Sequence, residues 1–243
     1  METNYHGSPY LPEENPNSRR GFLKKSIMIG ALAGISGANL LPGCREEAGE
    51  EVTPAEDLMR EHGVLDRIML VYDKLRMQLL NNEKISLDIL NNSAQIVKTF
   101  IEEYHEKLEE DHLFPLFEKA GMLTDLTGIL RTQHKAGRNL TGRIIEIGMQ
   151  GIEYSDDIKI LPALLESFNS MYRPHAARED TVLFPEIRKV VPEDEYITLG
   201  ENFEDKEHEL FGEEGFEGIV EKVSKIEQQL GIYELSLFTP ASQ

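Results

Sequence analysis

The 243-residue sequence has a single cysteine, Cys44, which excludes a disulfide within one chain. It also lacks a long hydrophobic run, because its most apolar stretch, residues 26–41, is short and interrupted by glycines, which argues against a membrane-spanning helix. No segment alternates apolar and polar residues for long enough to predict a β-strand. Basic residues are few: 25 lysines and arginines stand against 44 acidic residues, for a formal net charge of −19. A chain this acidic is repelled by phosphate backbones, so we expect no nucleic-acid partner.

The N-terminal region carries the features of an export signal. Residues 18–25 read SRRGFLKK and resemble the twin-arginine translocation signal at every position of its pattern. The apolar stretch that follows ends in residues 41–44, LPGC, which resemble a lipoprotein lipobox in which Cys44 becomes lipidated, although Pro42 is unusual there. We therefore predict a twin-arginine signal peptide over residues 1–43, a membrane anchor through lipid on Cys44, and an extracytoplasmic location in the periplasm or cell envelope. The alternative for Cys44 is a free thiol in a linker.

Beyond the signal, the sequence has the periodicity of helices. Residues 44–53 are charged and predict a tether. Thr53, Pro54 and Glu56 then combine an N-cap hydroxyl, a proline at the first helical position and a carboxylate that closes a capping box, which predicts a helix from here to about residue 80. Apolar spacing predicts further helices over about residues 86–119, 126–149 and 156–191. We expect the prolines inside these patterns to kink the helices or to split off a last turn; they are Pro115, Pro174 and Pro185.

These segments predict an all-α fold, an up-down-up-down four-helix bundle over residues 54–191. Residues 192–243 predict a C-terminal helical extension without chemistry of its own. Its last helix carries an apolar stripe made by Ile219, Val223, Ile226 and Leu230.

The sequence also repeats itself at an offset of 70 residues. Residues 105–115 and 175–185 share a histidine, a glutamate four positions later and then Leu-Phe-Pro, and a weaker match at an offset of 72 aligns His62 with His134. A histidine and a glutamate four residues apart lie about 40° apart on one helix face, so both side chains reach one point in the bundle interior. Buried without partners, each such group costs about 1–3 kcal/mol, whereas bound cations satisfy them all. We therefore predict a metal site formed by His62, His105, Glu109, His134, His175 and Glu179.

Imidazoles and carboxylates without a thiolate suit iron, manganese or zinc, and two shared carboxylates favour a dinuclear centre. This ordered ligand set, with its doubled His-x-x-x-Glu and Leu-Phe-Pro, resembles the hemerythrin-like HHE cation-binding family over about residues 56–190. The resemblance implies two iron ions, an oxo-bridged di-iron centre in which Glu109 and Glu179 bridge the ions and each histidine binds one of them; zinc and manganese are less favoured. Oxygen-carrying hemerythrins have a fifth histidine where this chain has Arg138, so the resemblance favours reaction with oxygen, peroxide or nitric oxide over simple carriage.

Three functions remain open at this point. The first is a protein that binds, senses or detoxifies a small diatomic ligand or oxidant, or that handles iron under oxidative or nitrosative stress. The second is a di-iron oxidase or peroxidase. The third is a metal-stabilised structural module. The sequence does not decide whether it is an enzyme, and it identifies no protein partner. Among the other polar residues, Glu110 and Asp180 correspond in the two repeats and either bind the ligand imidazoles or form a solvated face. We expect His112 to be structural or an outer partner of the site, and His208 to be exposed.

Overall fold

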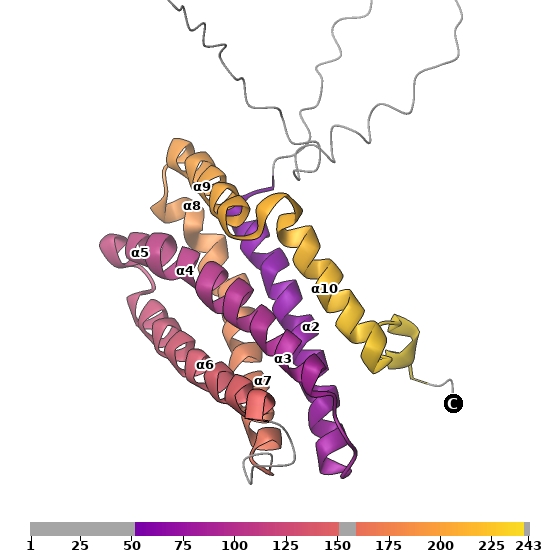
Figure 1. Cartoon of the computed structure of the whole chain (residues 1–243). Helices are drawn as coiled ribbons and strands as arrows, with labels where there is room; N and C mark the ends of the chain where they lie inside the picture. Colours follow the sequence, from indigo (N-terminus) through magenta and orange to yellow (C-terminus); the bar gives the residue numbers. More distant parts are fainter. Residues whose placement is uncertain (1–51, 151–158, 241–243) are drawn as a thin grey trace, which may run out of the picture. The chain divides into compact units, whose positions relative to one another are not determined.

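The computed structural model describes residues 52–150 and 159–240 (Figure 1). The predicted signal peptide with its lipobox, Cys44, nearly all of the tether, and residues 151–158, where the fourth helix was expected to start, lie outside the described residues. Every regular element in the described part is helical, which confirms the all-α prediction. None of the helices in residues 52–150 and 159–240 has the length and apolar character needed to cross a membrane.

The first described helix, α2 (Pro54–Leu80), begins where its capping residues predict. The backbone N–H of Glu56 donates to the Thr53 hydroxyl at 3.3 Å, and the backbone N–H of Thr53 donates to the Glu56 carboxylate at 2.9 Å. This reciprocal pair satisfies two of the N–H groups that a helix start leaves without partners. One side of α2 is buried along most of its length, so packing against the core stabilises the helix in addition to its cap.

The second helical segment starts after Ser86 and is closed by Gly121, whose φ of 66° is the left-handed conformation that glycine adopts without strain. It is not one regular α-helix, because π-helical turns alternate with α-helical ones. In chain order its parts are α3 (Leu87–Ile96), the π-helix η1 (Val97–His105), α4 (Glu106–Leu108), the π-helix η2 (Glu109–Leu113) and α5 (Phe114–Ala120). The apolar spacing predicts the extent of this segment but not its π turns.

The third and fourth segments follow the same plan. Helix α6 (Thr124–Gln150) is followed, after the residues left undescribed, by α7 (Leu161–Arg178), the π-helix η4 (Glu179–Leu183), the 3₁₀-helix η5 (Phe184–Glu186) and α8 (Ile187–Val190). Pro174 lies inside α7 without ending it.

The π turns of η2 and η4 occupy equivalent places in the two repeats. Each begins at a glutamate of the predicted metal site, Glu109 or Glu179, and each ends directly before Phe-Pro. A proline lacks the N–H that a helix needs, and its ring clashes with the carbonyl four residues earlier. The wider π turn before Pro115 and Pro185 accommodates this clash, so the prolines change the helical turn as well as interrupting the helix.

The helices pack along one another around a single core. Helix α2 lies against α7, α6 lies against both α3 and α7, and α10 (Gly215–Leu230) lies against α2 (Figure 1). The remaining elements are α9 (Glu193–Phe211), the 3₁₀-helix η6 (Gly212–Glu214) and, after α10, the 3₁₀-helix η7 (Leu235–Phe238). The predicted stripe on α10 faces the core: Ile219, Val223 and Ile226 are buried and Leu230 packs partly buried against them. The C-terminal extension is therefore part of the same packed unit as α2.

Candidate metal centre

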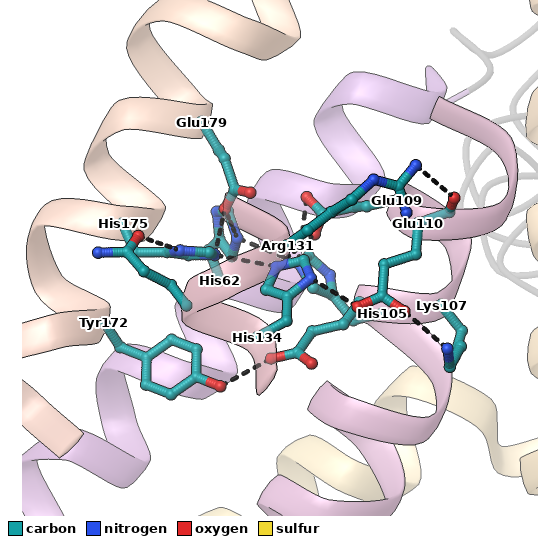
Figure 2. A network of polar contacts seen from close by, with 12 residues as sticks. His62, His105, Lys107, Glu109, Glu110, Arg131, His134, Tyr172, His175 and Glu179 are labelled. Carbon is teal, nitrogen blue, oxygen red and sulfur yellow. Dashed lines mark hydrogen bonds and ion pairs between the residues drawn. The ribbon is translucent and has the colours of Figure 1, made fainter. Parts of the chain in front are cut away.

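All six predicted metal ligands are buried and lie together in the interior (Figure 2). His62 comes from α2, His134 from α6 and His175 from α7. The others stand at the edges of the π turns: His105 is the last residue of η1, and Glu109 and Glu179 are the first residues of η2 and η4. Four helical segments thus each contribute to one polar cluster in the core.

The four histidines form two pairs. The Nε2 atoms of His62 and His105 are 3.1 Å apart, and those of His134 and His175 are 3.3 Å apart. Each pair directs two ring nitrogens at one point, which is the arrangement that two imidazole ligands of one cation require. Sequence spacing left open which histidines lie together, and in the structure His62 lies beside His105 and His134 beside His175.

The two carboxylates lie between the histidine pairs. Glu109 has one oxygen 3.8 Å from Nε2 of His105 and the other 3.4 Å from Nε2 of His134. Glu179 has one oxygen 3.0 Å from Nε2 of His175 and 3.3 Å from Nε2 of His62. Each carboxylate therefore contacts one histidine of each pair.

Every imidazole also hydrogen-bonds an outer partner through its other nitrogen. Nδ1 of His62 donates to Asp180 at 2.7 Å, and Nδ1 of His134 donates to Glu110 at 3.1 Å. Nδ1 of His105 donates to Glu61 at 2.7 Å, and Nδ1 of His175 donates to Gln133 Oε1 at 3.0 Å. In the neutral form of each ring these bonds fix the tautomer, so that Nε2 carries the lone pair that a cation binds.

The inner carboxylate oxygens supply a direct test of whether this cluster fits a cation. All four oxygens of Glu109 and Glu179 are buried, and beside neutral imidazoles none accepts a hydrogen bond from the described residues. Leaving a buried charged acceptor unsatisfied costs about 1–3 kcal/mol or more. Acceptor oxygens beside imidazole lone pairs form a donor set for a metal ion, and the cluster offers such sets as His62, His105 and Glu109, and as Glu109, His134, His175 and Glu179.

The electrostatics of the cluster without metal follow from burial and close contacts. Burial and the negative charge of Glu179 raise the pKa of Glu109 well above its usual range. Burial alone lowers the pKa of His62, but the hydrogen bond with Asp180 and the contact with Glu179 outweigh it and raise this pKa to about 9. Burial lowers the pKa of His134 to about 4. A cation that binds Nε2 of His62 therefore competes with a proton for this ring.

A second polar group lies behind the histidines of α6 and α7. The hydroxyl of Tyr172 donates to Glu106 at 2.7 Å, and Arg138 lies 2.8 Å from both Glu106 and Glu110. The Tyr172 ring packs edge-on against His175, with 5.4 Å between ring centroids. Gly137 makes room for the phenol, because a Cβ at this position would lie 1.9 Å from the Tyr172 oxygen.

Comparison with known proteins supplies the decisive observation. The model of the hemerythrin HHE cation-binding domain matches residues 53–187, more than half of the chain and all six clustered residues. The chain belongs to this family. Its relatives include uncharacterized proteins of Mycobacterium bovis and of two strains of Mycobacterium tuberculosis. Each is 45% identical over 217 residues, which cover 87% of this chain and 85% of the relative. No solved structure gives a significant match.

As a member of the HHE family the chain binds cations, and its histidine and glutamate cluster fits iron. Glu110 and Asp180, for which the sequence allowed either role, hydrogen-bond imidazoles of the cluster. Two outer partners were missed, Glu61 and Gln133. The weaker repeat held the signal for them, because each residue directly precedes a clustered histidine and the two align at the offset of 72.

Two expectations for the remaining histidines are corrected. His112 is exposed, and its ring lies 6.2 Å from that of Phe203 instead of beside a ligand imidazole. The expectation used the regular α-helical period, whereas the π turns of η2 rotate less per residue and carry His112 off the face of His105. His208 is half-buried on α9 and not fully exposed.

Proposed function

We propose that this HHE protein holds two iron ions and reacts with a small oxidant or diatomic ligand, namely oxygen, peroxide or nitric oxide. The observation that carries the proposal is the pair of buried carboxylates, Glu109 and Glu179, whose four oxygens accept no hydrogen bond from the described residues and lie between two histidine pairs. One cation at one histidine pair would leave the inner ring nitrogens of the other pair without a partner. Two cations satisfy both pairs and both carboxylates.

In this proposal His62 and His105 hold one ion, and His134 and His175 hold the other. Glu109 and Glu179 bridge the ions, because each carboxylate contacts one histidine of each pair. An oxo bridge between the ions completes the centre that the family resemblance implies. Zinc and manganese suit the same donor atoms and are the alternatives to iron.

The residues of the chain give such a centre its reactivity in two ways. Two imidazoles and two shared carboxylate oxygens leave each ion with fewer than six protein ligands, so that a small molecule has a position to occupy. Arg138, at the place of a fifth histidine, is engaged by Glu106 and Glu110 and presents only donor groups, so it supplies no further ligand. When bound, iron supplies electron transfer to the small molecule, while the protein excludes bulk water and fixes the imidazoles through Asp180 and Glu61.

We also propose the cellular setting and the topology that the sequence predicts. The twin-arginine pattern at residues 18–25 and the lipobox at residues 41–44 support export and a lipid anchor on Cys44 in the periplasm or cell envelope. The twin-arginine route carries folded proteins, which suits a protein that must bind its metal before it leaves the cytoplasm. The packing of α2, α6 and α7 with the segment from α3 to α5 supports an up-down-up-down bundle.

The test is the iron and zinc content of protein purified from its own host, with absorption spectra, for the wild type and two variants. We expect two iron ions per chain and near-ultraviolet bands of diferric iron in the wild type, and loss of both in the double variant His105→Ala, His175→Ala. The matched control is His112→Ala, which removes an exposed histidine from the same helical segment and is expected to keep both ions. Zinc in place of iron, or unchanged iron in the double variant, contradicts the proposal.

A di-iron oxidase or peroxidase is the second candidate. The buried phenol of Tyr172 favours it, because the ring lies against His175 and the hydroxyl is bonded to Glu106, which places an oxidisable group beside the proposed iron position. An enzyme must show repeated turnover with oxygen or peroxide, and Tyr172→Phe is expected to slow that turnover while the iron content stays at two. A purely structural metal site predicts instead that the double histidine variant unfolds.

A further inference from the structure

The two histidine pairs look alike at their inner faces but differ in the groups behind them. The pair His62 and His105 is backed by two carboxylates, Asp180 and Glu61, each at 2.7 Å from a ring Nδ1. Glu61 also lies in a buried group of three carboxylates with Asp57 and Glu207, whose oxygens are within 4.8 Å of one another. Both outer nitrogens of this pair therefore donate to carboxylates.

The pair His134 and His175 has a different environment. His175 donates to the neutral amide of Gln133 at 3.0 Å, in the place where His105 has a carboxylate. His134 donates to Glu110, but that carboxylate also accepts from Lys107 at 2.6 Å (Figure 2). It accepts from Arg138 as well, at 2.8 Å. Among the described residues, the outer nitrogens of this pair thus meet one carboxylate and one amide. That carboxylate pairs with Lys107 and with Arg138, which also lies 2.8 Å from Glu106.

This difference acts on the ions through the imidazoles. A carboxylate that accepts the Nδ1 proton makes the ring a stronger electron donor and stabilises the higher charge on a bound metal, whereas an amide does so less. The repeat gives both positions the same types of inner ligand, two imidazoles and the shared carboxylates, so the outer partners supply the difference in charge. The residues that do so are Glu61 and Gln133, at matching positions of the repeat.

We propose that Glu61 and Gln133 are positioning residues that make the two iron positions unequal in redox state. The position held by His62 and His105 loses its electron first and carries the ferric ion of a mixed-valence pair. The position held by His134 and His175 keeps the ferrous ion. This inference rests on the proposed di-iron function and adds the order in which the two ions are oxidised.

The experiment is a stepwise titration of the fully reduced, iron-loaded protein with ferricyanide, a one-electron oxidant, followed by electron paramagnetic resonance and Mössbauer spectroscopy. Each equivalent removes one electron from one ferrous ion and is itself reduced to ferrocyanide. We expect the fully reduced wild type to show two distinct ferrous components in the Mössbauer spectrum. Oxidation should then proceed in two separate steps, with a mixed-valence electron paramagnetic resonance signal after the first equivalent. A single two-electron step without that signal would overturn the proposal.

Two reciprocal variants assign the steps to the positions. Glu61→Gln is expected to disfavour the first oxidation by about tenfold or more in the equilibrium constant, and Gln133→Glu to favour the second by a similar factor. Each variant narrows the separation between the steps, and each shifts a different ferrous Mössbauer component. If both variants leave the separation unchanged, or both shift the same component, the proposal is wrong.

Iron content separates this inference from the proposed function. Two ions per chain in the wild type and in both variants, with equal behaviour of the two ions, overturns only the asymmetry. Absence of two ions in the wild type overturns the function on which it rests. If Glu61→Gln fails to fold, Gln133→Glu alone still tests the asymmetry. This variant adds a negative charge behind His175, so it should narrow the separation between the two oxidation steps.

Discussion

Substitution of Gly137 by alanine tests how closely α6 and α7 approach beside the metal cluster. A Cβ at this position would lie 1.9 Å from the Tyr172 oxygen, and 2.7 Å and 2.9 Å from two carbons of its ring. These distances are far below van der Waals contact, so either the helices separate or the tyrosine leaves its place. Tyr172 is buried and hydrogen-bonded to Glu106, which makes both responses costly.

The magnitude follows from three contributions. Overpacking a core costs about 1–3 kcal/mol, and loss of the Tyr172 hydrogen bond to a carboxylate costs about 1.5–3 kcal/mol. Alanine is a better helix former than glycine by about 1 kcal/mol, which offsets part of this. We expect Gly137→Ala to lower the free energy of unfolding by about 2–4 kcal/mol, which corresponds to roughly 5–15 °C in Tm for a unit of this size.

Chemical and thermal unfolding of the metal-free protein, followed by circular dichroism, measure this change. The matched control is Gly142→Ala on the same helix, where a Cβ would meet nothing within 4 Å, and which is expected to stabilise by about 0.5–1 kcal/mol. Tyr172→Phe in the Gly137→Ala background removes the closest atom and should recover part of the loss. If Gly137→Ala is as stable as Gly142→Ala, the described packing of α6 against α7 is incorrect.

Three further predictions concern the cluster and its surroundings. Cobalt(II) affinity should keep rising with pH above 7.5, by up to about tenfold per pH unit, because the cation must displace the proton that His62 holds with a pKa of about 9. Competition with a chelator at several pH values measures this rise, and Asp180→Asn should flatten the pH dependence. A wild-type affinity that is already constant above pH 7.5 would contradict the prediction. Arg138→Ala should destabilise the metal-free protein by about 1–3 kcal/mol in urea unfolding, because it removes the cation that pairs with Glu106. The range is reduced for the partial exposure of this arginine. An unchanged free energy of unfolding would show that the ion pair contributes nothing. Phe203→Ala on α9 should cost about 3–5 kcal/mol because this ring is fully buried, whereas Leu210→Ala at an exposed site of the same helix should change unfolding by less than about 0.5 kcal/mol; equal effects would mean that α9 does not pack as described.

The parts of this structure that the sequence predicts are those determined locally or by the repeat. The start of α2 follows from Thr53, Pro54 and Glu56, because a capping box involves residues only three apart. The clustering of the six histidines and glutamates follows from spacing and from their duplication, since burial of so many polar groups demands a common partner.

The remaining features depend on contacts between distant segments or on an irregular helical turn. Residue spacing does not encode the π turns of η2 and η4, and the regular α-helical period therefore misplaced His112. The bond between Glu106 and Tyr172 joins residues 66 positions apart, and the room for it depends on Gly137, which in the sequence is only another glycine within a helix.

The most direct test of the central claim is anomalous diffraction at the iron edge from crystals of the iron-loaded protein. The account predicts two iron peaks in each chain, one at the Nε2 atoms of His62 and His105 and the other at those of His134 and His175, with Glu109 and Glu179 bound to both ions. A single peak, or peaks away from these six side chains, would contradict it.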